Sequence, residues 1–362
     1  AVAWAARTHD RPPAVVSASH NPWPDNGVKL CEPGGLKLSD EDQHLMQALL
    51  ATGLRPDRTE VDVRIGSIDG YVDAVVESLD GRTFSGQRVV LDCANGAATA
   101  TAAEIFGRLD ADIIAIADQP DGRNINEGVG STYPETLTTT VLDHQAGAGF
   151  AFDGDADRVM ACGSDGRIID GDQILAMGAI DRRDHGHLPG STLVTTVMAN
   201  LGLRRAMEAE GITIVETPVG DRHVLEALDA GGYSFGGEQS GHIIHRDLAT
   251  TGDGVLTAAH LLDASIRRGV DLGEWAASVM VRYPQVLHNI RIDKPIADLD
   301  EALRPAVSAE EAALGVEGRI LVRATGTEPL IRVRVAASAA DIAEATARRL
   351  GAAVEAIAGA AR

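Results

Sequence analysis

The residues with the clearest chemical potential lie in a short acidic run, DGDADR, where Asp153, Asp155 and Asp157 occupy alternate positions. Alternate residues of an extended loop point the same way, so three carboxylates can converge on one hard cation. A calcium EF-hand loop is excluded, because its sixth position requires Gly and is Arg158, and its twelfth requires Glu and is Ser164. Magnesium fits better, since it accepts a few carboxylates and leaves room for a phosphate oxygen. The alternative is a solvated acidic turn.

A second group is SASHNP, residues 17–22, in which Ser19 and His20 precede a helix-breaking Asn-Pro pair. A Ser beside a His suggests a hydrolase, but adjacent residues rarely bring a nucleophile and its base together, and the chain has no G-x-S-x-G elbow. The alternative is a turn whose serine caps backbone groups. Lys29 is one of only three lysines, with Lys37 and Lys294. It follows the tight turn DNG, and a chain that doubles back there would bring its amine near Ser19.

Two further loops offer groups that suit a phosphorylated sugar. GGEQSGH, residues 236–242, presents a carboxylate, an amide, a hydroxyl and an imidazole on a flexible backbone, and a plain polar loop is the competing interpretation. RATGTEP, residues 323–329, joins two expected strands. Its arginine gives bidentate contacts, its hydroxyls add donors, and its glycine lets the backbone approach an anion. Taken alone, this second loop is a weak phosphate signal.

The elements that must position these loops follow an α/β pattern in most of the chain. Residues 89–91 and 113–116 read as strands on either side of a helix expected over 97–109, which is a βαβ unit with a parallel sheet. The stretch STLVTTV, the helix LGLRRAMEAEG and the strand ITIVETPV repeat this pattern. A strand over 14–16, a helix near 40–50 and a helix over 254–268 are also expected.

The last part of the chain has a different pattern of expected helices and strands. Strands in HNIRID, RILVRA and LIRVRVAA, a helical stretch through Leu314 and an Ala-rich final helix predict an α+β module with an antiparallel sheet. We therefore expect three α/β domains and one α+β domain. Their predicted bounds are residues 1–68, 69–170, 171–280 and 281–362.

Composition narrows the choice of partners. The formal net charge of −21, from 53 acidic and 32 basic residues, repels nucleic acid and anionic membranes, so neither is expected to bind. No stretch is long and apolar enough to span a bilayer. The three cysteines are odd in number and widely spaced, which favours reduced thiols and a cytoplasmic location. An anionic small molecule remains open as a substrate, because a cleft can gather a few cations.

Taken together and in this order, the four loops resemble those of the α-D-phosphohexomutase superfamily. SASHNP is similar to its phosphoserine loop, DGDADR to its metal loop, GGEQSGH to its sugar-binding loop and RATGTEP to its phosphate-binding loop. The likeness covers essentially the whole chain. Within the superfamily, GGEQSGH together with PVGDRHV and TTGDG is most similar to the bacterial phosphoglucosamine mutase family.

The resemblance implies four domains around a central cleft and the interconversion of glucosamine 6-phosphate and glucosamine 1-phosphate. It implies one Mg²⁺ per active site, a sugar bisphosphate as activator and a sugar phosphate as the small-molecule partner. Ser19 would carry the phosphoryl group and share the metal with the three aspartates, and Lys29 would be the general acid/base. The other implied active-centre residues are His20 and Arg158. The implied substrate-binding residues are Arg222, Glu238, Ser240, His242, Arg323, Thr325, Gly326 and Thr327.

Two departures from the family pattern matter. The chain starts shortly before the phosphoserine loop, so the first domain is expected to be truncated, with an open sheet edge and weak activity. Thr325 stands where Ser is commoner, but the hydroxyl is kept. Two alternatives to the phosphoglucosamine mutase reaction stay open: a phosphomannomutase or phosphoglucomutase, and an inactive mutase fragment that only binds sugar phosphate. The oligomeric state is also open, with a homodimer as one option.

Overall fold

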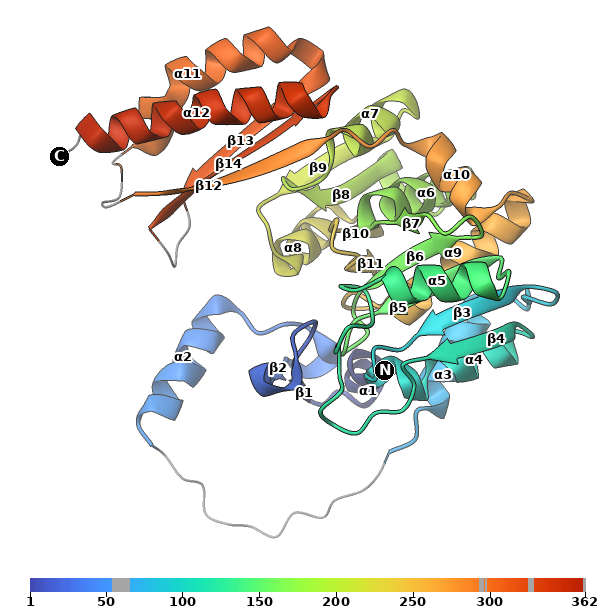
Figure 1. Cartoon of the computed structure of the whole chain (residues 1–362). Coiled ribbons are helices and arrows are strands. Elements are labelled where there is room, and N and C mark those ends of the chain that lie inside the picture. Colours follow the sequence, from blue (N-terminus) through green and yellow to red (C-terminus); the bar gives the residue numbers. More distant parts are fainter. Residues whose placement is uncertain (54–65, 293–295, 297, 325–328, 361–362) are drawn as a thin grey trace. The chain divides into compact units, whose positions relative to one another are not determined.

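The computed structural model describes residues 1–53, 66–292, 296, 298–324 and 329–360. The chain divides into two compact units, each described here by itself (Figure 1). The first unit comprises Ala1–Ala199 and Met207–Val279, and the second comprises Asn200–Ala206 and Met280–Arg362. The fold class is α/β, with mixed sheets, as predicted. None of the described helices combines the length and the apolar character needed to cross a bilayer.

The first unit begins with a thin segment built on a hairpin. Strand β1 (Ala14–Ser17) pairs antiparallel with β2 (Gly27–Leu30), and this two-stranded sheet includes no other strand. The expected strand over 14–16 is confirmed, and so is the helix near 40–50, which is α2 (Asp40–Ala51) with Ser39 as its N-cap. The remaining elements of this segment are α1 (Val2–His9), η1 (Trp23–Asp25) and η2 (Pro33–Gly35).

A five-stranded sheet follows, in the order β4-β3-β5-β6-β7. Its parallel strands are β3 (Arg88–Asp92), β4 (Asp112–Ile116) and β5 (Ala148–Phe152), and β6 (Val159–Gly163) and β7 (Ile168–Ile169) extend it antiparallel. Helices α3 (Asp69–Glu77), α4 (Ala102–Arg108) and α5 (Glu135–Asp143) belong to this part. Side chains of β5 alternate in the usual strand period: Phe150 stacks on Phe106 of α4, and Ala151 packs with Val141 of α5.

The expected helix over 97–109 is interrupted. Residues Ala97–Ala100 form a 3₁₀ turn, η3, and the α-helix starts only at Ala102. The reason lies in tertiary contacts, because the N–H of Ala97 donates to the carbonyl of Gly154, 2.8 Å away in the acidic loop. A Cβ at Gly96 would lie 2.3 Å from that same carbonyl. The first turn therefore supports the acidic loop and departs from α-helical geometry.

A second sheet of the first unit has the order β11-β10-β8-β9. Strands β8 (Thr192–Thr196), β9 (Thr213–Thr217) and β10 (Phe235–Gly237) are parallel, and β11 (Ile243–His245) is antiparallel to β10. The predicted βαβ pattern is confirmed, with α7 (Leu201–Ala209) between β8 and β9. The other elements here are α6 (Gly171–Asp184), η4 (Pro189–Ser191), α8 (Asp221–Gly231), α9 (Gly254–Arg268) and α10 (Leu272–Val279).

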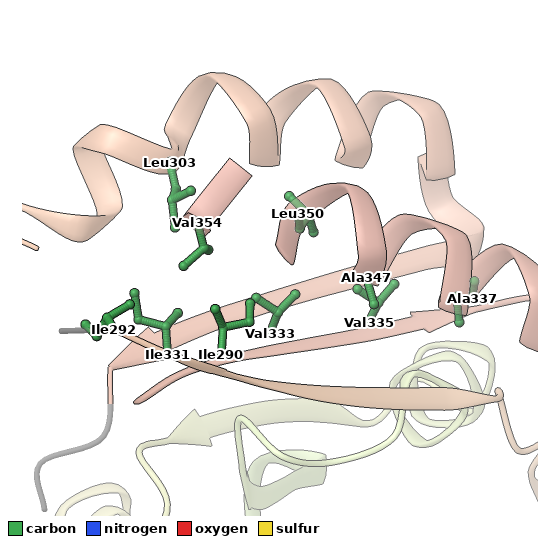
Figure 2. Packing of buried hydrophobic residues seen from close by; sticks show 11 residues of the cluster. Ile290, Ile292, Leu303, Ile331, Val333, Val335, Ala337, Ala347, Leu350 and Val354 are labelled. Atoms are coloured by element: carbon green, nitrogen blue, oxygen red, sulfur yellow. The ribbon is translucent and has the colours of Figure 1, made fainter. Parts of the chain in front are cut away.

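The C-terminal part of the second unit has an antiparallel sheet in the order β12-β14-β13, as predicted. The strands are β12 (Gln285–Arg291), β13 (Gly318–Ala324) and β14 (Leu330–Ala337), and the helices are α11 (Leu299–Leu314), η5 (Gly315–Glu317) and α12 (Ala340–Ala360). Both long helices cover one face of the sheet (Figure 1). Figure 2 shows the core between the sheet and these helices, where Val333 and Ile331 face Leu350, Val354 and Leu303.

Candidate active site

The acidic loop joins β5 to β6 at the carboxyl end of β5, the edge of a parallel sheet where ligands bind. One carboxylate oxygen from each of Asp153, Asp155 and Asp157 lies within 4.8 Å of the others. Asp155 Oδ1 and Asp157 Oδ1 are buried and have no hydrogen-bond partner among the described residues. Buried oxygens in such a group are the donor set that a hard divalent cation takes, so the residues present fit Mg²⁺.

The electrostatics of the three aspartates support the same conclusion. Burial raises the pKa of Asp153 well above its ordinary value, and the neighbouring Asp157 and Asp155 raise it further. Burial also acts to raise the pKa of Asp157, but His242, Lys29 and Arg158 outweigh it and the pKa of that carboxyl is lowered. Three carboxylates this close repel one another, and a divalent cation between them would remove that repulsion.

The structure brings Ser19 to this cluster. Its Oγ lies 3.4 Å from Asp153 Oδ2 and 3.4 Å from His20 Nδ1. The predicted meeting of the serine hydroxyl and the aspartate triplet is therefore confirmed. Ser19 has φ +52°, in the left-handed region.

Hydrogen bonds to the main chain of Ser19 hold the loop that carries this residue on the sheet. The N–H of Gly154 donates to the Ser19 carbonyl at 3.1 Å, and Asn126 Nδ2 donates to the carbonyls of Ser19 and Asn21, each at 2.8 Å. A Cβ at Gly154 would lie 2.6 Å from the Ser19 carbonyl oxygen, so only glycine allows this approach. Sequence reasoning missed Asn126, because nothing in its local pattern distinguishes it from a turn asparagine.

Two cationic side chains border the aspartates. Lys29 Nζ contacts Asp155 Oδ2 at 2.6 Å and Asp157 Oδ2 at 3.7 Å. Burial would lower the pKa of Lys29, but the hydrogen bond to Asp155 and the charges of the three aspartates raise it overall. Arg158 Nε lies 3.8 Å from Asp157 Oδ1. The amine predicted to lie near Ser19 therefore contacts the aspartates beside that serine.

His20 completes the immediate surroundings of Ser19. Its pKa is lowered by burial first and by the charge of Arg158 next, against the opposing effect of Asp155 and Asp157. The neutral imidazole is thus favoured over the imidazolium.

Ser17 is a functional candidate that sequence reasoning missed. Its Oγ donates to Asp155 Oδ2 at 2.9 Å and accepts from the N–H of Ser19 at 2.7 Å. The available signal was the S-x-S spacing, which puts a second hydroxyl two residues before Ser19, at the end of β1. Ser17 therefore connects the aspartate cluster to the backbone of Ser19.

The predicted sugar-binding loop joins β10 to β11 in the second sheet, which is the same position that the acidic loop has in the first. Glu238 Oε1 accepts a hydrogen bond from the N–H of Gly220 at 3.1 Å. Ser240 Oγ is buried and finds no hydrogen-bond partner within the described part of the chain. The N–H of Val159 donates to the carbonyl of Gly241 at 3.1 Å, so the two loops touch.

His242 is placed differently from the expectation of direct substrate contact, whereas the role of Arg222 stays a prediction. The His242 side chain is only 2% exposed, with Nδ1 3.6 Å from Asp157 Oδ2 and Nε2 3.5 Å from Asp221 Oδ2. Its Nε2 also accepts the N–H of Gly252 at 3.2 Å, so the ring offers almost no open surface to a substrate. Arg222 Nε contacts Glu226 Oε1 at 2.8 Å, one helical turn along α8.

The predicted phosphate-binding loop belongs to the second unit. Arg323 lies in β13, opposite Arg332 of β14. Thr325, Gly326 and Thr327 lie outside the described residues. The assignment of these four residues to a phosphate stays a prediction.

Matches to protein-family models cover nearly the whole chain. Residues 1–55, 69–166 and 170–283 match α/β/α domains I, II and III of phosphoglucomutase/phosphomannomutase, and residues 287–352 match its C-terminal domain. The chain belongs to the phosphoglucomutase/phosphomannomutase family, the α-D-phosphohexomutases, whose members are isomerases.

Sequence relatives place the chain more narrowly. It is 52% identical over 343 residues to a phosphoglucosamine mutase of Thermobifida fusca (strain YX), covering 93% of this chain and 76% of that protein. Within the family it therefore stands among the bacterial phosphoglucosamine mutases.

Two solved structures share the fold. A phosphoglucomutase/phosphomannomutase family protein from Burkholderia thailandensis has a TM-score of 0.78 at 23% identity, over 98% of this chain and 80% of that chain. An Aspergillus fumigatus N-acetylphosphoglucosamine mutase, solved in complex with GlcNAc-6P and magnesium, has a TM-score of 0.75 at 19% identity, over 98% and 90%. At these identities the likeness shows the fold alone.

Proposed function

We propose that this chain interconverts glucosamine 6-phosphate and glucosamine 1-phosphate through a phosphorylated Ser19. The observation that carries the proposal is the 3.4 Å contact between Ser19 Oγ and Asp153 Oδ2, inside the cluster of three aspartates. The free thiols of Cys31, Cys93 and Cys162 are consistent with an enzyme of the cytoplasm.

The reaction consists of two phosphoryl transfers. In the first, the P–O bond to Ser19 Oγ breaks while a P–O bond to the free sugar hydroxyl forms, which gives a sugar bisphosphate. In the second, the other phosphate returns to Ser19 Oγ. The attacking hydroxyl loses a proton and the departing oxygen gains one, so protons balance over each transfer. Lys29 and His20 are the side chains beside Ser19 that we propose to carry this proton.

Asp153, Asp155 and Asp157 would hold a Mg²⁺ ion together with a phosphate oxygen on Ser19. A bound Mg²⁺ supplies the positive charge that phosphoryl transfer requires on the oxygens of the moving group. Arg158 adds a second cation at the same place. Glu238 and Ser240 are proposed to bind sugar hydroxyls, a role supported by the buried and unpartnered Oγ of Ser240.

Replacement of Ser19 by Ala tests the proposal directly. We expect Ser19→Ala to abolish mutase turnover of glucosamine 6-phosphate in the presence of Mg²⁺ and the bisphosphate activator. Intact-mass measurement should find one phosphate on the unchanged protein and none on Ser19→Ala. Ser39→Ala is a matched control in the same segment, since it removes only a helix cap that contributes about 1 kcal/mol to stability. Normal turnover by Ser19→Ala would refute the phosphoserine scheme.

Substrate choice and metal dependence need separate assays. Chelation should remove turnover and Mg²⁺ should restore it. A clear preference for mannose or glucose phosphates would favour the neutral-sugar mutases of the family. A chain that binds sugar phosphate but never turns it over would be the inactive alternative.

A further inference from the structure

Lys37 has no role in the scheme above, yet it makes a long-range contact near the candidate active site. Its Nζ forms an ion pair with Asp221 Oδ2, which joins residues 184 positions apart in the sequence. The two side chains are 33% and 24% exposed, so the pair is partly shielded from solvent. Lys37 lies shortly after the hairpin that carries Ser19, in an isolated bridge with Cys31.

Asp221 is the residue at which several connections meet. Its carboxylate faces Lys37 and lies 3.5 Å from His242 Nε2, and the other ring nitrogen of His242 faces Asp157. The N–H of the preceding residue, Gly220, donates to Glu238 Oε1. His242 Nε2 accepts the N–H of Gly252 at 3.2 Å, so it does not donate to Asp221. Asp221 therefore reaches the loop over residues 238–242 through its neighbour Gly220, at Glu238.

A second contact docks the same segment. Thr250 Oγ1 donates to the carbonyl of Gly35 at 3.2 Å, two residues before Lys37. Lys37 also lines a cavity of about 750 Å³ whose wall includes Ser17, Lys29 and Asp155. The side chain of Lys37 therefore connects the serine-bearing segment to the start of α8.

We propose that Lys37 and Asp221 are positioning residues that hold the sugar-binding loop, residues 238–242, in register with the segment that carries Ser19. The inference rests on the proposed function, because it assigns the pair to substrate binding by that loop. Neither residue needs to touch the substrate. The pair acts through Gly220, whose N–H orients Glu238.

Lys37→Met is the informative variant, because it removes the charge and keeps the aliphatic stem. Loss of a partly exposed ion pair predicts that KM for glucosamine 6-phosphate rises about fivefold, with kcat changed less than about twofold. Asp221→Asn should act in the same direction. The double variant should be no worse than the more affected single variant, because both changes remove one interaction. Lys37→Arg keeps the charge and should restore KM to within about twofold of the unchanged protein.

The matched control is Arg88→Met. Arg88 forms an ion pair of similar type with Asp112, but both side chains are more than half exposed and the pair lies at the start of β3 and β4. Arg88→Met should leave kcat and KM unchanged. An unchanged KM in Lys37→Met, or equal losses in kcat with Lys37→Arg and Lys37→Met, would overturn the inference.

Hydrogen exchange provides a readout that does not require activity. In Lys37→Met, amides of residues 218–224 and 236–242 should exchange about fivefold faster, and in Arg88→Met they should not. If the unchanged protein turns over no sugar phosphate, the proposed function fails, while exchange still decides whether the pair holds the loop. Unchanged exchange in both segments would overturn the inference on its own.

Discussion

The N-terminal segment, residues 1–53, and the five-stranded sheet that follows it are stabilised in different ways. Within the segment, only Ala6 and Ala18 are buried among the hydrophobic side chains that the structure describes, and Val16, Val28 and Leu50 are largely exposed. In the sheet, strands β3 and β5 are almost completely buried. The segment has no core of its own, although it carries Ser19 and Lys29.

The segment is attached to the packed part by polar contacts and by Leu36, which packs against the buried cluster that includes Val194 and Val224. Gly154 and Asn126 donate to the backbone around Ser19, Lys29 pairs with Asp155, and Lys37 pairs with Asp221. Hydrogen bonds and partly exposed ion pairs contribute less each than buried aromatic side chains do. The comparison teaches that the fold is stable because of the sheets, whereas the geometry of the site depends on contacts at their edge.

The largest effect on stability should come from the packed region. Phe150 is fully buried and its ring centroid lies 5.8 Å from that of Phe106. We expect Phe150→Ala to lower the free energy of unfolding by about 3–5 kcal/mol, the usual cost of emptying an aromatic site in a core. Denaturant unfolding followed by circular dichroism measures this. A loss below about 1 kcal/mol would show that the sheet is less well packed than the structure indicates.

The next largest effect should be a pH dependence of the free energy of unfolding, which also comes from the packed region. The rings of His245 and His260 lie 5.3 Å apart, and His260 Nε2 contacts Ser78 Oγ at 2.9 Å. Burial, and next the charge of Arg182, lowers the pKa of His260 to about 4, and the same two causes lower the pKa of His245 well below its ordinary value.

The sign of that effect follows from proton uptake. Below about pH 6.5 the unfolded chain protonates these histidines, while folded His260 stays neutral until about pH 4. The free energy of unfolding should therefore fall as pH falls through this window, by about 3 kcal/mol for His260 alone. Unfolding measured between pH 7 and pH 4 tests this, and His260→Gln should flatten the dependence. An unchanged slope in that variant would contradict the assignment.

A smaller effect, on kcat/KM, is expected where the N-terminal segment contacts the five-stranded sheet. Asn126 is buried and donates to two carbonyls of the loop that carries Ser19. Asn126→Ala removes this donor from the Asn21 carbonyl and leaves the Ser19 carbonyl with the N–H of Gly154, and it should lower kcat/KM about 30-fold, equivalent to about 2 kcal/mol. Asn124→Ala is the control, since among the described residues its side chain bonds only within its own exposed loop, to the N–H of Asp121 and the carbonyl of Gln119. Equal losses in both variants would mean that loop disorder, rather than the position of Ser19, causes the defect.

The smallest effect should come from the exposed face of the N-terminal segment. Leu50, near the end of α2, is 79% exposed. Leu50→Gln has a similar helix propensity and should change the free energy of unfolding by less than about 0.5 kcal/mol. A loss above about 1 kcal/mol, measured as for Phe150→Ala, would show that α2 packs against a surface in solution.

Local pattern was sufficient to predict most elements and the aspartate cluster. The alternation in DGDADR, directly after an apolar strand, fixes both the direction of the carboxylates and their place at the sheet edge. The α/β pattern likewise predicted parallel pairing of β3 with β4 and of β8 with β9. These features depend on residues close in sequence.

The residues that were missed depend on contacts between distant segments. Ser17 meets Asp155 across 138 positions, Asn126 meets Ser19 across 107, and Lys37 meets Asp221 across 184. The prediction of a helix over 97–109 was wrong at its start for the same reason, because the N–H of Ala97 donates to the carbonyl of Gly154. Propensity and periodicity contain no information about such partners.

The backbone of Ser19 has a thermodynamic consequence of its own. Glycine adopts φ +52° without strain, whereas a residue with a Cβ stores roughly 1 kcal/mol of conformational strain there. The proposed function requires an oxygen nucleophile at this position, so glycine could not replace serine there. The chain keeps a disfavoured backbone torsion at Ser19, and the packed sheet that this loop contacts through Gly154 stabilises the fold enough for that strain to persist.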